Sequence, residues 1–182
     1  MTTNNRKLKL DFQEASTLFL AYPEEVVDCG VDYSSASPVF DRIIRALPSN
    51  MNLVVFTKTA RIASNIEKMR RKRTTTLVNS ELSSIWLKDT AGFNMSSQIV
   101  KATYKPRYYR KYFDEAAIID SYNKVIHSII GVDMIQIPLI WDGGNLVTNG
   151  EVGFITDQIL HDNKKTHSEK EILDLIKSTL GI

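Results

Sequence analysis

Two aspartates in the sequence have neighbours that suit the binding of a cation. Asp89 lies in segment 85–92 (IWLKDTAG), and Asp142 lies in segment 140–145 (IWDGGN). An acidic residue that ends an apolar strand is presented at the carboxyl edge of a sheet, where α/β proteins often bind ligands. Two carboxylates near tryptophans suit a guanidinium, because this planar cation donates bidentately to carboxylates and is attracted to aromatic faces. The pattern therefore favours a site for a flat, positively charged group.

The same two segments also have a purely structural interpretation. An aspartate before glycine commonly forms a turn, since its side chain bonds to nearby backbone groups. A tryptophan one or three residues earlier is commonly a core residue. Spacing alone leaves both interpretations open.

The hydrophobic pattern predicts a mixed α/β protein whose elements position these residues. Apolar runs predict strands at 17–22, 52–57, 75–79, 84–88 and 134–140, and a strand pair or one long strand at 92–104. Helical spacing predicts a helix that begins at Ser37-Pro38, helices at 59–70 and 115–130, and a last helix from Ser168 to Gly181.

Two short motifs add detail to this outline. Thr148-Asn149-Gly150-Glu151 predicts a hairpin with a type I′ turn, because Asn and Gly accept positive φ angles. Ser168-Glu169-Lys170-Glu171 predicts a capping box at the start of the last helix.

The composition is that of a globular protein without a resident metal. Of 182 residues, 43% are apolar and 24% are charged, and the net charge of +2 argues against a protein built mainly to bind polyanions. No apolar run approaches the roughly 20 residues that a membrane span needs. The single cysteine, Cys29, excludes an internal disulfide and a multi-cysteine zinc site. We expect one cytoplasmic domain over residues 1–182, with no metal and no cofactor.

Three motifs together resemble those of the agmatine deiminase and bacterial, Porphyromonas-type peptidylarginine deiminase family. Trp86-Leu87-Lys88-Asp89 followed by Gly92 resembles the family's Trp-x-Arg-Asp-x-Gly-Pro motif. Asp142-Gly143-Gly144-Asn145, then Asn149-Gly150 and Ile155-Thr156-Asp157, resembles its (Glu/Asp)-Gly-Gly-Asn, Asp-Gly and Thr-(Glu/Asp) block. Phe19-Leu20-Ala21-Tyr22-Pro23 resembles its N-terminal (Met/Leu)-Ala-Trp-Pro strand.

The resemblance implies a pentein fold, an α/β propeller of five ββαβ-type units, and hydrolysis or transfer of a guanidino group. The substrate would be agmatine, arginine or a peptide arginine. In such enzymes a cysteine thiolate attacks the guanidinium carbon, a histidine serves as general acid and base, and carboxylates hold the guanidinium nitrogens. By motif position the resemblance implies these substrate-binding residues: Trp86, Asp89, Asp142, Gly143, Gly144 and Asn145.

The chain matches only the N-terminal half of the family pattern, about two and a half of five units. The family's His-x-Asp motif and its nucleophilic cysteine belong to the other half. Cys29 follows acidic residues that disfavour its thiolate, so we do not expect it to be the nucleophile. No histidine lies in a His-x-Asp pattern: His127 falls on a predicted helix, and His161 and His167 fall in a polar loop. We therefore expect the chain to be inactive alone.

An incomplete propeller leaves unpaired strand edges, which predicts a homo-oligomer or a separate C-terminal half as partner. A truncated gene product is another interpretation of the short match. Three motif positions also depart from the family: Lys88 replaces Arg, Phe93 replaces Pro, and Asp142 replaces the commoner Glu.

Two other functions stay open beside the deiminase interpretation. One is a non-catalytic module that binds a guanidino ligand or another protein. The other, weaker, is a nucleic-acid binder that uses the basic segments 68–73 and 105–113. The first basic segment is also typical of a helix C-terminus, where cations complement the helix dipole.

Overall fold

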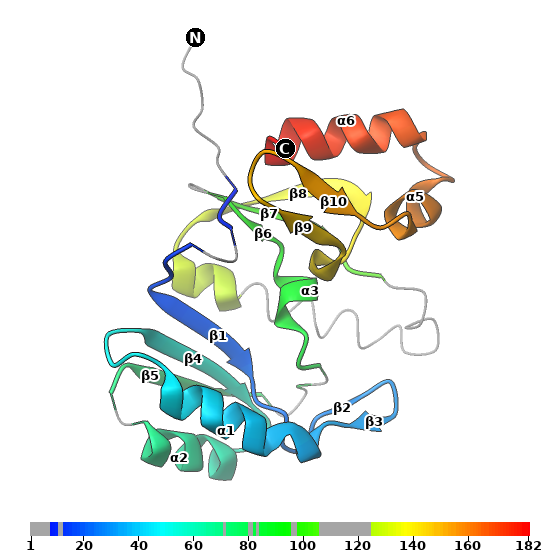
Figure 1. The fold of residues 1–182 in the computed structure, drawn as a ribbon. Helices are drawn as coiled ribbons and strands as arrows, with labels where there is room; N and C mark the ends of the chain where they lie inside the picture. Colours follow the sequence, from blue (N-terminus) through cyan, green and yellow to red (C-terminus); the bar gives the residue numbers. More distant parts are fainter. Residues whose placement is uncertain are drawn as a thin grey trace. The chain divides into compact units, whose positions relative to one another are not determined.

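A computed structural model describes residues 8–10, 13–70, 72–79, 82, 84–95, 98–105 and 125–182. Contacts divide the chain into two compact units. One comprises residues 14–87, and the other comprises residues 1–13 together with 88–182. Both units mix helices with short sheets (Figure 1).

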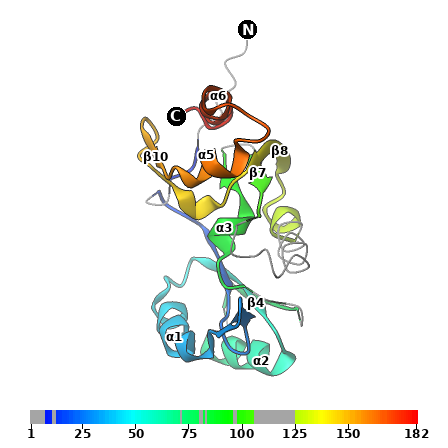
Figure 2. The same cartoon turned by 90° about the vertical axis from the view of Figure 1, so that its right-hand side faces the viewer.

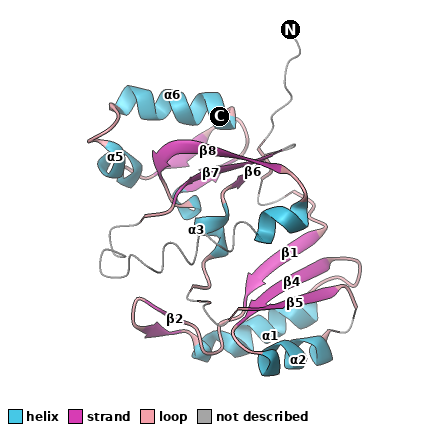
Figure 3. Cartoon of the chain, turned by 180° about the vertical axis from the view of Figure 1, so that it is seen from behind, coloured by secondary structure: helices cyan, strands magenta, loops and turns pink. Residues whose placement is uncertain are grey.

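The unit of residues 14–87 is built on a parallel sheet in the order β1-β4-β5. Its strands are β1 (Thr17–Ala21), β4 (Asn52–Thr57) and β5 (Thr74–Val78). Helix α1 (Ser37–Ala46) connects β1 to β4, and α2 (Ala60–Met69) connects β4 to β5. Because crossovers between parallel strands are right-handed, both helices lie on the same face of the sheet (Figures 1 and 3). All five elements confirm the sequence-based prediction.

Alternate side chains of β4 pack against the apolar faces of the two helices in this unit. Leu53 and Val55 face the helices and form a cluster with Ile44, Ile62 and Ile66. Helix α2 begins at Thr59, whose hydroxyl accepts a hydrogen bond from the Ile62 amide at 3.3 Å. That bond satisfies one of the free N–H groups of the first turn.

A small hairpin that the sequence pattern did not predict precedes α1. Strands β2 (Val27–Asp28) and β3 (Val31–Asp32) pair antiparallel around Cys29 and Gly30, and a 3-10 helix η1 (Ser34–Ala36) follows. The φ angles of Cys29 and Gly30 are +49° and +82°, which is the backbone of a type I′ turn.

The other unit contains a sheet in the order β6-β7-β8. Strands β6 (Phe93–Asn94) and β7 (Gln98–Thr103) are antiparallel, whereas β7 and β8 (Asp133–Ile140) are parallel. The segment 92–104 is thus a strand pair. In the part of the chain that the structure describes, β8 is an edge strand, where Pro138 costs no ladder hydrogen bond.

The C-terminal third covers this sheet. The hairpin of β9 (Leu146–Thr148) and β10 (Gly153–Ile155) leads into α5 (Gln158–Asn163) and α6 (Glu169–Leu180), which lie beside one another near β8 (Figures 1 and 2). Ser168 and Glu171 form the predicted capping box, and Gly181 ends α6 with a φ of +75°. Buried side chains of this core include Phe93, Met95, Leu139, Trp141, Ile159 and Ile172.

Three local predictions are wrong. Residues 84–88 do not form a strand, since Leu87–Ala91 is the short helix α3. The hairpin at Asn149 exists, but a four-residue loop replaces the type I′ turn, because the Asn149 side chain accepts from the amides of Glu151 (3.0 Å) and Val152 (2.9 Å). His161 lies in α5 rather than in a loop.

One further prediction concerns a segment that the structure describes only in part. Of the predicted helix 115–130, residues 125–130 are helical and Gly131 follows with a φ of +71°, whereas 115–124 lie outside the described residues.

Within the described ranges, none of the helices has the length and apolar character that crossing a membrane requires. The same ranges contain no group of three or more His, Cys, Asp or Glu side chains arranged to hold a metal ion.

Candidate functional site

Asp142 lies directly after β8, in a turn that its own side chain organises. Its carboxylate accepts hydrogen bonds from the Asn145 amide at 3.1 Å and from Asn145 Nδ2 at 2.8 Å. These bonds cap the short 3-10 helix η3 (Gly143–Asn145). The sequence Asp-Gly-Gly-Asn therefore forms a closed turn at the carboxyl end of a strand, as the pattern predicted.

The two glycines of this turn bring it against α3. A Cβ atom on Gly143 would collide with the carbonyl oxygen of Lys88. A Cβ atom on Gly144 would collide with Oδ1 of Asp89 and would lie 3.5 Å from Oδ1 of Asp142. Both carboxylates thus face the same glycine and lie close together. Asp89 and Asp142 are partly buried, whereas Gly144 is exposed.

The surroundings of Asp142 act on its ionisation in two opposite directions. Burial raises the pKa of Asp142, and the nearby carboxylate of Asp162 raises it further. The amides of Asn145 and Gly144 act in the opposite direction by donating to the charged form. Because burial is the largest cause, ionising this carboxylate costs more free energy here than it does in water.

Asp162 is a residue that sequence reasoning missed. It lies on α5, a helix that the pattern did not predict, in a segment interpreted as a polar loop. Its effect on Asp142 depends on the packing of α5 against β8. No local sequence signal marks that packing.

Two asparagines hold the turn in place. Asn145 Oδ1 accepts a hydrogen bond from the Thr156 hydroxyl at 3.0 Å, which ties the Gly-Gly motif to the Thr-Asp motif. Asn163, buried on α5, accepts from the Ile140 amide and donates to the Ile140 carbonyl, both at 2.8 Å. It also donates to the Ile159 carbonyl at 2.8 Å. Asn145 therefore positions Asp142, and Asn163 fixes the end of β8 two residues before it.

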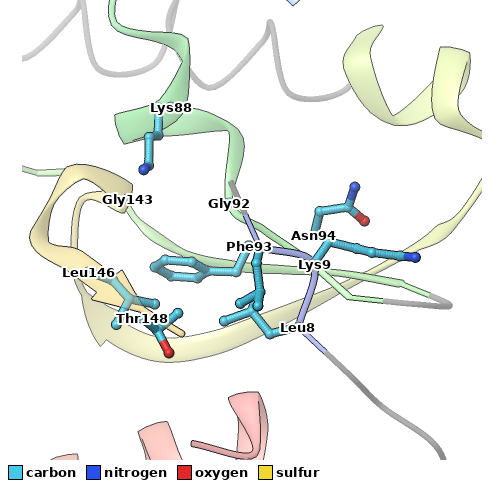
Figure 4. A pocket seen from close by; sticks show the side chains of 10 residues that line it. Leu8, Lys9, Lys88, Gly92, Phe93, Asn94, Gly143, Leu146 and Thr148 are labelled. Atoms are coloured by element: carbon cyan, nitrogen blue, oxygen red, sulfur yellow. The ribbon is translucent and has the colours of Figure 1, made fainter. Parts of the chain in front are cut away.

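A cavity of about 140 Å³ borders the junction of α3 and η3. Figure 4 shows Lys88 extending from α3 toward this cavity and the ring of Phe93 lying beside Leu146. Gly143 and Gly92 contribute to its wall, but Asp89 and Asp142 are not among the residues that line it. The two carboxylates are thus close to one another and next to, rather than inside, this hollow.

The remaining predicted site residue, Trp86, belongs to the unit of residues 14–87, whereas both aspartates belong to the other unit. Trp86 is 50% exposed, and its ring makes an edge-to-face contact with the ring of Tyr33, with centroids 6.1 Å apart. A stacking role for Trp86 at the substrate stays a prediction.

The basic segment 68–73 has a structural role where it is described. Arg70 donates to the backbone carbonyls of Leu47, Pro48 and Met51, and Arg73 donates to the carbonyl of Asn50. These hydrogen bonds hold the end of α2 against the loop that precedes β4. Of the other basic segment, 105–113, all but Lys105 lies outside the described residues.

The sequence profile of the Porphyromonas-type peptidyl-arginine deiminases matches residues 7–182. The chain belongs to this family. No curated protein is matched by its sequence. Among solved structures, a Porphyromonas gingivalis protein described as an arginine deiminase superposes with a TM-score of 0.75 at 19% identity, covering 97% of this chain and 55% of that one. The agmatine deiminase of C. jejuni gives a TM-score of 0.77 at 13% identity, with 97% and 54% covered.

These similarities establish the mixed α/β fold of this family member. The agmatine deiminase of Enterococcus faecalis is also similar, with a TM-score of 0.68 and 14% identity, covering 98% of this chain and 52% of that one. The chain thus spans about half the length of the solved relatives that it matches.

Proposed function

We propose that this chain binds the guanidino group of an arginine-like substrate through Asp89 and Asp142, as part of a deiminase-type hydrolase. The observation that carries the proposal is the convergence of both carboxylates on Gly144. Carboxylates on two elements can pair with different N–H groups of one planar guanidinium, which fixes the position of its carbon. Membership of the deiminase family supports the same chemistry.

The catalytic step needs groups that these 182 residues do not supply. Hydrolysis of a guanidino group requires a nucleophile on the central carbon and an acid to protonate the departing nitrogen. The single cysteine, Cys29, occupies the tight turn between β2 and β3, in the unit that does not contain the two aspartates. We therefore propose that the chain binds substrate but does not hydrolyse it alone, and that hydrolysis needs a second half of a five-unit propeller.

The binding proposal is tested by calorimetric titration of the purified chain with agmatine and with N-carbamoylputrescine, which keeps the ammonium end but carries a neutral ureido group in place of the guanidinium. Agmatine is expected to bind at least about tenfold more tightly, because only the guanidinium pairs with two carboxylates. Asp89→Asn and Asp142→Asn should each remove this preference. Asp133→Asn, at the opposite end of β8, is the matched control and should leave it unchanged. Equal binding of both compounds would contradict the proposal.

The catalytic proposal is tested by incubating the same chain with agmatine, arginine and a peptide that contains arginine. No carbamoylputrescine or citrulline is expected from any of the three. Product that disappears in Cys29→Ser would show that Cys29 is a nucleophile and would refute this part of the proposal. A non-catalytic binding module would also bind a guanidinium without forming product. Adding the catalytic half of a relative distinguishes the two functions, because turnover is restored only if the chain is part of a hydrolase.

A further inference from the structure

The loop between β9 and β10, residues 149–152, contains the only Asn-Gly pair in the sequence. Asn149 is exposed, and Gly150 follows it with a φ of +93°, which glycine adopts without strain. Asparagine is chemically labile, because the main-chain nitrogen of the next residue can attack its side-chain carbonyl carbon. A glycine in the next position leaves that nitrogen unhindered, since it has no Cβ atom. None of these atoms belongs to the proposed guanidino site.

The side-chain oxygen of Asn149 receives two hydrogen bonds from the backbone. The amide of Glu151 donates to Oδ1 at 3.0 Å, and the amide of Val152 donates to it at 2.9 Å. Attack on Cγ of Asn149 moves negative charge onto this oxygen. Backbone N–H groups that already point at an oxygen stabilise the charge that develops there, because no solvent has to reorganise around it. The loop thus activates the carbonyl group of Asn149.

The attacking nitrogen is held by a neighbouring hydroxyl. The N–H of Gly150 donates to Oγ1 of Thr148 at 2.9 Å, and the Thr148 hydroxyl donates in turn to the Val152 carbonyl at 2.8 Å. A hydroxyl both accepts and donates, so Oγ1 can take the proton of the nitrogen as it passes its own to solvent. Thr148 therefore supplies an acceptor at the atom that must lose its proton.

We propose that Asn149 is a site of spontaneous deamidation that the folded hairpin promotes. The Gly150 nitrogen forms a bond to Cγ of Asn149 and gives up its proton. The bond from Cγ to Nδ2 breaks, and Nδ2 takes up one proton and leaves as ammonia. A five-membered succinimide ring remains, and water opens it at either carbonyl. The net change is that one amide and one water become one carboxylic acid and one ammonia.

Ring opening gives two products that affect the hairpin differently. Aspartate at position 149 retains an oxygen that can accept from the Glu151 and Val152 amides, and it adds a negative charge. Isoaspartate instead places an extra methylene in the main chain between residues 149 and 150, which moves the acceptor oxygen. The loop aligns β9 with β10, and Leu146 of β9 is part of the core. The isoaspartate form is therefore expected to melt at a lower temperature than the aspartate form.

The test is incubation of the purified chain in mildly alkaline buffer, followed by proteolysis and mass spectrometry of the peptide that contains residue 149. Loss of the amide raises the mass of this peptide by nearly one unit, and chromatography separates the two products. Deamidation of the folded chain is expected to be at least about threefold faster than that of the same chain unfolded in urea. Asn145, which precedes a leucine, is the internal control and should retain its amide.

Variants of Thr148 test the role of its hydroxyl. Thr148→Val keeps the shape of the side chain but removes the acceptor, and should slow deamidation of the folded chain by about threefold. Thr148→Ser keeps the hydroxyl and should retain the rate, which a structural role of the methyl group would not explain. In urea both variants should react as fast as the unchanged chain, because the hairpin is absent. Asn149→Gln should show no change in mass.

Three outcomes would overturn the proposal. They are a folded chain that deamidates no faster than the unfolded one, equal rates for folded Thr148→Val and Thr148→Ser, and a change in mass that persists in Asn149→Gln. Asp89→Asn should leave the rate of deamidation unchanged, so this result and the result for the guanidino site are independent of each other.

Discussion

The carboxylate of Asp142 experiences two opposing influences. Burial and the neighbouring Asp162 disfavour its ionised form, while hydrogen bonds from the turn of residues 143–145 favour it, and burial is the larger effect. A group with a raised pKa in the native state costs stability when it is ionised, and it gains most from an added cation.

A pH titration of stability tests this balance. Since the native pKa of Asp142 lies above its unfolded value, the native state binds the proton more tightly, and Asp142 destabilises the fold increasingly as pH rises from about 4 through the raised pKa. We therefore expect the melting temperature of Asp142→Asn, relative to that of the unchanged chain, to rise between about pH 4 and about pH 7. Asp133→Asn should show a flat difference, and Asp162→Asn should move the Asp142 transition to lower pH. A difference that falls with pH would refute the assignment.

The two glycines of the Asp-Gly-Gly-Asn turn are expected to respond differently to alanine. At Gly143 the added Cβ meets the Lys88 backbone, which cannot move aside, so Gly143→Ala should destabilise the unit by about 1–3 kcal/mol. At Gly144 the Cβ meets the Asp89 side chain, which can rotate away. Gly144→Ala should therefore retain more stability but lose agmatine binding. Thermal denaturation and calorimetry distinguish the two effects, and equal losses of stability would count against the close approach to Asp89.

At the scale of elements, the site depends on how β8 and α5 are joined. Asn163 is 2% exposed and satisfies both backbone groups of Ile140, at the end of an edge strand where they would otherwise lack partners. The position of this strand end determines the position of Trp141 and Asp142, the residues at which the Asp-Gly-Gly-Asn turn begins. A helix that the sequence pattern did not predict thus holds a turn that it did predict.

Replacement of Asn163 tests this connection. Asn163→Leu removes three hydrogen bonds and leaves buried backbone groups without partners, so unfolding should become easier by about 2–4 kcal/mol. Agmatine binding should weaken as well, measured well below the melting temperature. Lys164→Leu, at the exposed next position, is the control and should change neither quantity. Full stability of Asn163→Leu would show that water replaces the side chain and that Asn163 does not position β8.

At the scale of the whole molecule, an apolar face remains exposed. In the hairpin of β9 and β10, Phe154 pairs with Val147, and the two side chains are 72% and 68% exposed. The opposite face of the same hairpin carries Leu146, which is buried in the core. An exposed aromatic and aliphatic pair on a two-stranded sheet is a surface that favours association.

We expect the purified chain to self-associate through this face. Light scattering over a range of concentrations should show a mass above 20.7 kDa, and Phe154→Ser should lower it. Leu173→Ser, which changes an exposed apolar residue on α6, is the control and should leave the mass unchanged. A monomer at every concentration would contradict the expectation.

The sequence by itself determined most elements and the motifs. Apolar periodicity located β1, α1, β4, α2 and β8, because burial of one face is encoded residue by residue. The capping box at Ser168 was equally clear, since its bonds are local. Family membership also followed from the order of the motifs, which needs no coordinates.

Only the tertiary structure decided which groups meet. Segment 84–88 has the composition of a strand, yet only its last two residues are regular and they begin α3. The contact between Asp89 of this helix and Gly144 joins residues more than fifty positions apart. The same holds for Asp162 and Asn163, whose significance depends on packing between elements. Short-range bonds are encoded in neighbouring residues, whereas the meeting of distant side chains depends on how buried surfaces fit together, which no local pattern records.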